Sequence, residues 1–296
     1  MFVQESWPQS MEQMGTKDKF WFEDNSERLW LFKYIRENTG EDWSEKIAEY
    51  LCNCLGLPHA TYELAITWKS GRGVASLSFL RSNEQLILGN QLLGTIDLGY
   101  LQKRKKYRNS FHTVDAVMQS LEKVAPPRGW NLPQGIKTAP EVFVGYLMLD
   151  ALIGNGDRHD ENWAVVEGIS GMQQALAPTF DHASSLGMLL GDEERRQRLT
   201  TKDRGYSVAV YANKATSALY QSVSDLKPLS TLAAFVEAGN MYPQAARLWL
   251  AQLSSVAMED FAEGLGKIPK NRISSVAIDF ALRLLAHNMA RLQQTL

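Results

Sequence analysis

The segment that most constrains this chain is an apolar helix that ends directly in a polar turn. Residues 142–153 are apolar on nearly every side, and this pattern predicts a helix that is enclosed by other elements. Thr138 and Glu141 have the spacing of a capping box, which predicts where the helix begins. A Gly-Asn-Gly turn at 154–156 follows the helix, and Asp157 comes directly after that turn.

Two short apolar strands follow the turn and are expected to pair as a hairpin. They are predicted at residues 163–166 and at about 172–177. Asn162 precedes the first strand and Asp181 follows the second, so both side chains belong to the open end of the hairpin, where Asp157 also arrives. Carboxylate and amide oxygens suit a hard cation such as Mg²⁺, which takes one or two carboxylates together with substrate phosphates.

The order of these residues is typical of the catalytic centre of a kinase. There the first Asp handles the acceptor hydroxyl, while the Asn and the later Asp hold the metal. The alternative is a polar loop in which Asn and Asp serve only the turn. Because the helix, the hairpin and the three side chains occur together, we favour catalytic roles for Asp157, Asn162 and Asp181. His159 is interpreted as a group that orients Asp157 and the backbone rather than as a metal ligand or an acid/base group.

The first part of the chain is expected to be rich in strands. Aromatic and apolar runs between turn formers predict strands at 19–22, 29–35, 61–65 and 74–80. One helix interrupts these strands, from about Asp42 to Leu55, and Gly56 is placed to end it.

Beyond about residue 110 the periodicity becomes helical. Near the C-terminus, four apolar residues recur at the spacing of one helix face: Ile273, Ala277, Phe280 and Leu284. We therefore predict an α+β, protein-kinase-like bilobal fold. Residues 1–85 are expected to form a small β-rich N-lobe, and residues 86–296 a larger, mainly helical C-lobe.

Lys33 lies in the middle of a predicted strand, where a solvated amine fits poorly unless an anionic group receives it. In kinases such a lysine reaches the nucleotide phosphates and is held by a helix glutamate. Glu45, at the start of the following helix, is the candidate partner, and Glu49, one turn later, is the rival. The simpler interpretation makes Lys33 an exposed residue and Glu45 a helix-capping partner of Asp42.

Three further segments have candidate roles in binding. Gly15, Thr16 and Lys17 precede the first strand and form the candidate loop that covers the phosphates, although this loop holds a single glycine. The basic run 103–108 is interpreted as solvated surface, with docking of an acidic or RNA-bearing substrate as the alternative. The polar stretch 182–206 occupies the place of a kinase activation segment and is the expected site of acceptor recognition.

The composition excludes several classes of protein. The 296 residues are 45% hydrophobic and 22% charged with a formal net charge of −2, so overall charge does not drive nucleic-acid binding, and no direct DNA binding is expected. No apolar run approaches the ~18 residues that span a membrane, and no secretory signal is visible. Cys52 and Cys54 indicate neither a disulfide framework nor a zinc site. We expect a cytoplasmic protein without membrane contact.

Two segments resemble those of a known family. The run Asn155-Gly-Asp-Arg-His-Asp-Glu-Asn162 resembles the Asn-x-Asp-Arg-His-x-x-Asn catalytic loop of the HipA-type kinases, which are bacterial serine/threonine kinases best known as toxins of toxin–antitoxin pairs. Residues 176–185 are similar to the metal-binding segment of that family. The catalytic loop is also similar to the Asp-Arg-His-x-x-Asn loop of phosphatidylinositol kinases.

The resemblance implies an ATP- and Mg²⁺-dependent kinase that acts on serine or threonine of a protein. It implies that Asp157 is the catalytic base, that Asn162 and Asp181 bind Mg²⁺, and that Lys33 binds the ATP phosphates with Glu45 as its partner. It also implies a toxin role, with an antitoxin or an N-terminal-domain-like partner chain. Two alternatives stay open: a small-molecule or phosphatidylinositol-type lipid kinase, and a pseudokinase that acts as a binding module.

Overall fold

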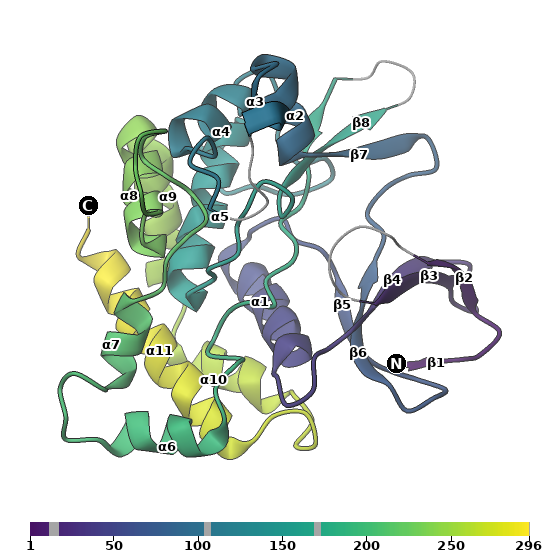
Figure 1. The fold of residues 1–296 in the computed structure, drawn as a ribbon, viewed down its shortest axis with the longest axis vertical. Coiled ribbons are helices and arrows are strands. Elements are labelled where there is room, and N and C mark those ends of the chain that lie inside the picture. Colours follow the sequence, from purple (N-terminus) through teal and green to yellow (C-terminus); the bar gives the residue numbers. More distant parts are fainter. Residues whose placement is uncertain (12–17, 104–107, 169–172, 296) are drawn as a thin grey trace.

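The predicted α+β bilobal fold is confirmed. The computed structural model describes residues 1–11, 18–103, 108–168 and 173–295, which form a curled sheet and a larger helical part (Figure 1). Between them lies helix α1 (Glu41–Leu55), which contacts two strands of the sheet and the C-terminal helices α9 and α10.

The N-terminal sheet has six strands in the order β1-β5-β6-β4-β3-β2. The strands are β1 (Phe2–Val3), β2 (Pro8–Met11), β3 (Lys19–Glu23), β4 (Leu29–Tyr34), β5 (Tyr62–Thr67) and β6 (Arg72–Leu77). Neighbours are antiparallel except for β1, which runs parallel to β5. The four predicted strands are thus present, while the short strands β1 and β2 were not predicted.

The register of β3 and β4 explains the position of Lys33. Phe20 pairs with Phe32 and Phe22 with Trp30, and all four side chains are buried in one apolar cluster. Because side chains alternate between the two faces of a strand, Lys33 lies on the face opposite to Phe32. The aromatic pattern of the strand therefore directs this lysine out of the apolar cluster.

A buried carboxylate on α1 joins the sheet to the helical part. Asp42 is fully buried and accepts hydrogen bonds from Arg72 of β6 at 2.8 and 2.9 Å and from Arg272 of the helical part at 2.8 Å. Gly56 ends α1 in the left-handed region at φ 67°, as expected for a helix-stop glycine. The bounds of the predicted helix are thus confirmed to within one residue.

The helical part is built around α5 (Ala139–Ile153), in which every residue except Glu141 is buried. The predicted capping box is present, since Thr138 and Glu141 each accept a hydrogen bond from the other's backbone N–H. The last helix buries Ala277, Phe280 and Leu284 of the predicted face, whereas Ile273 is buried but precedes the N-cap Ser274 and lies outside the helix. The other helices are α2 (Gly89–Ile96), α3 (Tyr100–Lys103), α4 (Val114–Leu121), α6 (Asp192–Thr200), α7 (Val208–Asn213), α8 (Thr231–Met241), α9 (Pro243–Ser254), α10 (Met258–Gly266) and α11 (Ser275–Gln293).

The predicted hairpin belongs to a second, three-stranded sheet. Strands β8 (Ala164–Gly168) and β9 (Ala175–Leu176) pair antiparallel, and β7 (Glu84–Leu88) adds to the other edge of β8. Strand β7 was not predicted, and the proposed lobe boundary at residues 85 and 86 falls within it. Residues 169–171 of the connecting turn, and residue 172 at the predicted start of the second strand, lie outside the described ranges.

The polar stretch 182–206 contains the regular helix α6, which packs on α11. Arg195 of this helix is buried and donates to the Gly187 carbonyl at 3.1 Å. Within the described ranges, no helix combines the length and the apolar character that crossing a membrane requires.

Candidate active site

The loop between α5 and β8 is held by the end of α5. Gly154 ends the helix in the left-handed region at φ 66°. The side-chain amide of Asn155 then donates to Asp150 Oδ1 at 2.8 Å, and its oxygen accepts from the Asp157 backbone N–H at 3.2 Å. The turn therefore places Asp157 at the end of a buried helix.

A buried ion pair also holds the loop between α5 and β8 in place. Arg158 is fully buried and donates through two nitrogens to both carboxylate oxygens of Asp150, at 2.7 and 2.8 Å. Its remaining nitrogen donates to the carbonyls of Asn162 at 2.8 Å and Phe180 at 3.3 Å. Burial opposes the charge, but the Asp150 carboxylate raises the pKa of Arg158 above its ordinary value. One guanidinium thus connects the loop between α5 and β8 to the loop after β9.

We expect Arg158→Ala to destabilise the protein by about 3–5 kcal/mol, because the substitution leaves Asp150 buried without its counter-charge. Urea unfolding followed by circular dichroism measures this loss. The matched control is Arg283→Ala, since Arg283 is exposed on α11, and its cost should stay within about 0.5 kcal/mol. A loss below about 1 kcal/mol for Arg158→Ala would show that the pair does not fasten the loop.

Asp157 is half-exposed, with a side-chain exposure of 49%, which suits a residue that must meet a substrate. The Ser184 hydroxyl donates to Asp157 Oδ2 at 3.4 Å, and His159 Nε2 lies 3.8 Å from Oδ1. Because His159 Nδ1 accepts from the Glu161 backbone N–H at 3.1 Å, the proton of the neutral ring is on Nε2, toward Asp157. His159 Nε2 therefore faces the carboxylate of Asp157.

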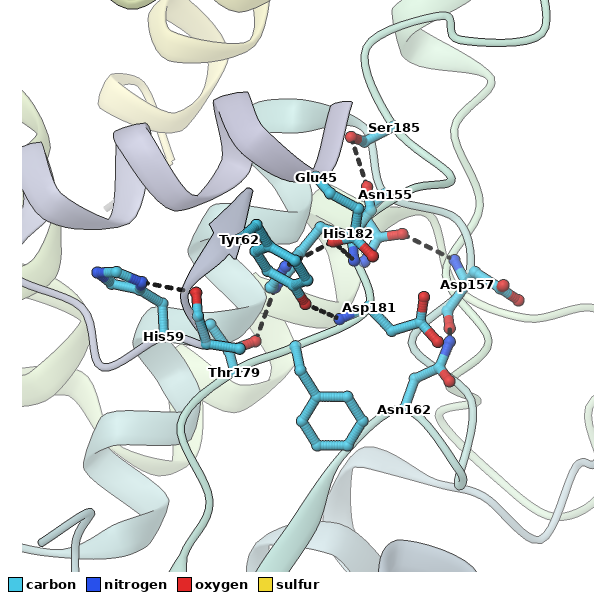
Figure 2. Close-up of polar contacts among 12 residues, drawn as sticks. Glu45, His59, Tyr62, Asn155, Asp157, Asn162, Thr179, Asp181, His182 and Ser185 are labelled. Carbon is cyan, nitrogen blue, oxygen red and sulfur yellow. Dashed lines mark hydrogen bonds and ion pairs between the residues drawn. The ribbon is translucent and has the colours of Figure 1, made fainter. Parts of the chain in front are cut away.

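Asn162 can present an oxygen to a cation. Its side-chain nitrogen donates to the backbone carbonyl of Asp157 at 2.6 Å, which fixes the orientation of the amide and leaves its oxygen as the available ligand. Figure 2 shows that Asn162 and Asp181 lie close together, whereas the carboxylate of Asp157 points away from them. An amide oxygen and a carboxylate are a donor set that fits Mg²⁺.

Asp181 has an unusual backbone conformation. Its φ of 60° lies in the left-handed region, which non-glycine residues seldom adopt and which is enriched at functional sites. The Asp181 backbone N–H donates to the Tyr62 hydroxyl at 3.0 Å, so strand β5 supports this conformation (Figure 2). The small lobe thus holds the residue predicted as a metal ligand.

Lys33 is brought to Asp181, with 3.4 Å between Nζ and Oδ1. Its side chain is only 15% exposed. Burial opposes the ammonium charge, but Asp181 and then Glu45 raise the pKa of Lys33 above its ordinary value. The lysine therefore stays charged at the junction of the two lobes, and the exposed-surface interpretation of Lys33 does not describe this geometry.

Glu45 contributes in a way that the sequence did not indicate. Its carboxylate is buried and accepts from the His182 backbone N–H at 2.8 Å, directly after Asp181 (Figure 2). His182 is buried too, and desolvation followed by the charge of Arg158 moves its pKa well below the ordinary value. The rival partner Glu49 forms an ion pair with Lys46 at 2.8 Å. Glu45 is thus a charged neighbour of Lys33 that also positions the loop of Asp181.

Some predicted positions cannot be placed, and some residues of the site were missed. Gly15, Thr16 and Lys17 and residues 104–107 of the basic run lie outside the described ranges. Asp150 and Tyr62 were not predicted as members of the site. An aspartate inside the otherwise apolar helix 142–153 was the available signal for Asp150, whereas nothing local distinguished Tyr62.

No family model and no curated protein matches the sequence. Solved structures do match the fold. The Helicobacter pylori proinflammatory kinase CtkA superposes with a TM-score of 0.72 at 18% sequence identity, over 98% of this chain and 95% of that chain.

A chain of the Shewanella oneidensis MR-1 toxin–antitoxin complex of HipA, HipB and operator DNA superposes with a TM-score of 0.54 at 14% identity. The match covers 98% of this chain and 65% of that chain, so this protein spans about two thirds of its length. These likenesses agree with the bilobal architecture. The chain therefore has the fold of the HipA- and CtkA-like kinases.

Proposed function

We propose that the chain is an ATP- and Mg²⁺-dependent protein kinase that phosphorylates serine or threonine. The observation that carries this proposal is the 3.4 Å ion pair between Lys33 and Asp181 in a kinase fold. It joins strand β4 to the loop after β9, beside Asn162 and the loop of Asp157. A buried lysine and a carboxylate at the junction of two lobes form the kind of site that holds nucleotide phosphates.

Asn162 and Asp181 are the proposed ligands of Mg²⁺, which when bound would neutralise charge on the β- and γ-phosphates. Lys33 contacts the same phosphates through Nζ in this proposal. Glu45 acts through the His182 backbone, which it holds next to Asp181. Residues 15–17 remain the proposed covering loop.

Asp157 is the proposed base and accepts the proton of the acceptor hydroxyl. The hydroxyl oxygen bonds to the γ-phosphorus, the bond from that phosphorus to the β–γ bridging oxygen breaks, and ADP leaves with that electron pair. His159 is the proposed positioning residue, since its Nε2 faces the Asp157 carboxylate at 3.8 Å.

Transfer of labelled γ-phosphate from ATP to casein, a mixed serine/threonine acceptor, tests the proposal. We expect Mg²⁺-dependent labelling by the wild-type protein, and Lys33→Met should lower kcat/KM for ATP by about 10–100-fold, because the phosphates lose a buried cation. Lys69→Met is the matched control, since Lys69 is exposed between β5 and β6 and should leave the rate unchanged.

Two outcomes of this assay would contradict the proposal. A folded wild-type protein that turns over no ATP would be a pseudokinase. Labelling of choline or of inositol lipids, but of no protein, would identify a small-molecule or lipid kinase instead.

A toxin role with a partner chain is the second part of the proposal. It is supported by the fold likeness to a complex that contains HipA, HipB and operator DNA. The proposed partner is an antitoxin or a chain that takes the place of an N-terminal domain, and the proposed site of action is the cytoplasm.

A further inference from the structure

A cavity of about 640 Å³ borders Asp157. Its walls come from three stretches of the chain: residues 108–112, the catalytic loop at 156–160, and residues 216–228. Every described lining residue belongs to the helical part, so the cavity is separate from the site of Lys33. None of them comes from the stretch 182–206, where acceptor recognition was expected from the sequence.

The walls are held together by hydrogen bonds that need no ligand. His112 is fully buried, and its Nε2 accepts from the Trp163 indole N–H at 3.1 Å. Since an indole can only donate, the other ring nitrogen carries the proton and donates to the Ala218 carbonyl at 3.1 Å. The Tyr220 backbone N–H donates to the His112 carbonyl at 3.0 Å. The cavity is therefore preorganised, which lowers the cost of binding.

Two cations line this cavity. Arg108 and Lys227 both line it, and both are exposed. Neither side chain forms a hydrogen bond or an ion pair with any residue in the part of the chain that the structure describes. Arg108 also has a φ of 55°, a conformation that a non-glycine residue seldom adopts. Two exposed cations beside the proposed base Asp157 favour an acceptor that carries negative charge of its own.

The same cavity has an apolar edge. Leu226 lines it and is 94% exposed, the most exposed large apolar side chain in the described part of the chain. Val223, close by in sequence, is 55% exposed. A small polar acceptor would leave both side chains in water, whereas a polypeptide can cover an apolar edge and reach the cations at the same time.

We propose that this cavity is the acceptor site and that its occupant is a protein segment with an acidic residue near the phosphorylated serine or threonine. The inference rests on the proposed function and deepens it by naming the substrate class. The acceptor hydroxyl lies at Asp157, the acidic side chain contacts Arg108 and Lys227, and an apolar side chain covers Leu226.

The experiment uses peptide libraries with a central serine or threonine and with Asp, Lys or Ala fixed at each flanking position in turn. We expect the wild-type protein to phosphorylate Asp-containing over Lys-containing peptides by roughly 3–10-fold at one or more positions, as weak exposed ion pairs allow. Arg108→Glu combined with Lys227→Glu should reverse this ratio. The ratio is measured within each variant, so a change in overall rate does not affect it.

Lys270→Glu is the matched control, because Lys270 is an exposed lysine between α10 and α11, outside the cavity, and should leave the ratio unchanged. If the double variant fails to fold, Lys227→Ala at an exposed position should still lower the ratio. Equal rates for Asp and Lys peptides, or an acidic preference that survives both substitutions, would overturn the inference while the kinase activity stands. A wild-type protein that transfers no phosphate would instead overturn the proposed function.

Discussion

Asp157→Asn should lower phosphate transfer by at least ~10²-fold while binding of ATP and Mg²⁺ stays close to that of the wild type. The amide keeps the shape of the side chain but loses the negative charge and the site that accepts the proton. The position of Asn162 should survive, because Asn162 donates to the backbone carbonyl of Asp157 and not to its carboxylate. Single-turnover transfer and nucleotide titration calorimetry measure the two quantities separately.

The control for this variant is Asp279→Asn, since Asp279 is exposed on α11 and should change neither quantity. A shift in the Mg²⁺ dependence caused by Asp157→Asn alone would mean that the base and the metal ligand have been exchanged in our assignment.

The Asp157→Asn variant also tests the proposed toxin role. Production of the wild-type protein should slow bacterial growth and the variant should not, whereas unimpaired growth with active kinase would exclude that role.

Asp181→Asn should lower transfer by on the order of 10²–10³-fold or more and should also raise the Mg²⁺ concentration needed for half-maximal rate. The substitution removes the carboxylate proposed to tie the metal to the phosphates, and it removes the ion-pair partner of Lys33. Titration of Mg²⁺ at saturating ATP measures both effects. Asparagine is the informative replacement, because it tolerates the left-handed conformation that Asp181 adopts at φ 60°.

Comparison of Asp181→Asn with Asp181→Ala separates the effect of the lost charge from the effect of backbone strain at residue 181. Asp181→Ala removes the same carboxylate but is also strained in the left-handed region, so it should lose more stability than Asp181→Asn in urea unfolding. The Asp157→Asn variant serves as the matched control for the Mg²⁺ titration. Near wild-type turnover of folded Asp181→Asn would contradict the metal-binding role and the kinase proposal with it.

Much of the fold could be predicted because the relevant signals are local. The capping box of Thr138 and Glu141, the helix stop at Gly56 and the aromatic alternation of β3 and β4 each act within a few residues. The strands that were missed, β1, β2 and β7, lie at the edges of their sheets, and β1 and β2 have only 2 and 4 residues. β1 and β7 pair with strands far along the chain, β5 and β8, and that pairing leaves little trace in their own residues.

In the candidate site too, the features carried by one local segment could be predicted, and those that join distant segments could not. The five-residue spacing of Asp157 and Asn162, and the place of Asp181 after a hairpin, were readable because one loop and one hairpin carry them. The partner of Lys33 was not readable. The local sequence offers both Glu45 and Glu49 as partners, while the structure pairs Lys33 with Asp181, far along the chain.

The sequence by itself determined three of the helices (α1, α5 and α11), most of the strands, the polar loop and the chemical character of its side chains, because these depend on neighbours within a few residues. Only the tertiary structure decided which charges meet: Arg272 with Asp42, Lys33 with Asp181, and Arg108 and Lys227 at one cavity. With 31 basic and 33 acidic residues, the possible pairs are too many for composition or spacing to select one. The choice is made when burial of the apolar faces brings the elements together, because a buried charge is tolerated only where packing also supplies its partner.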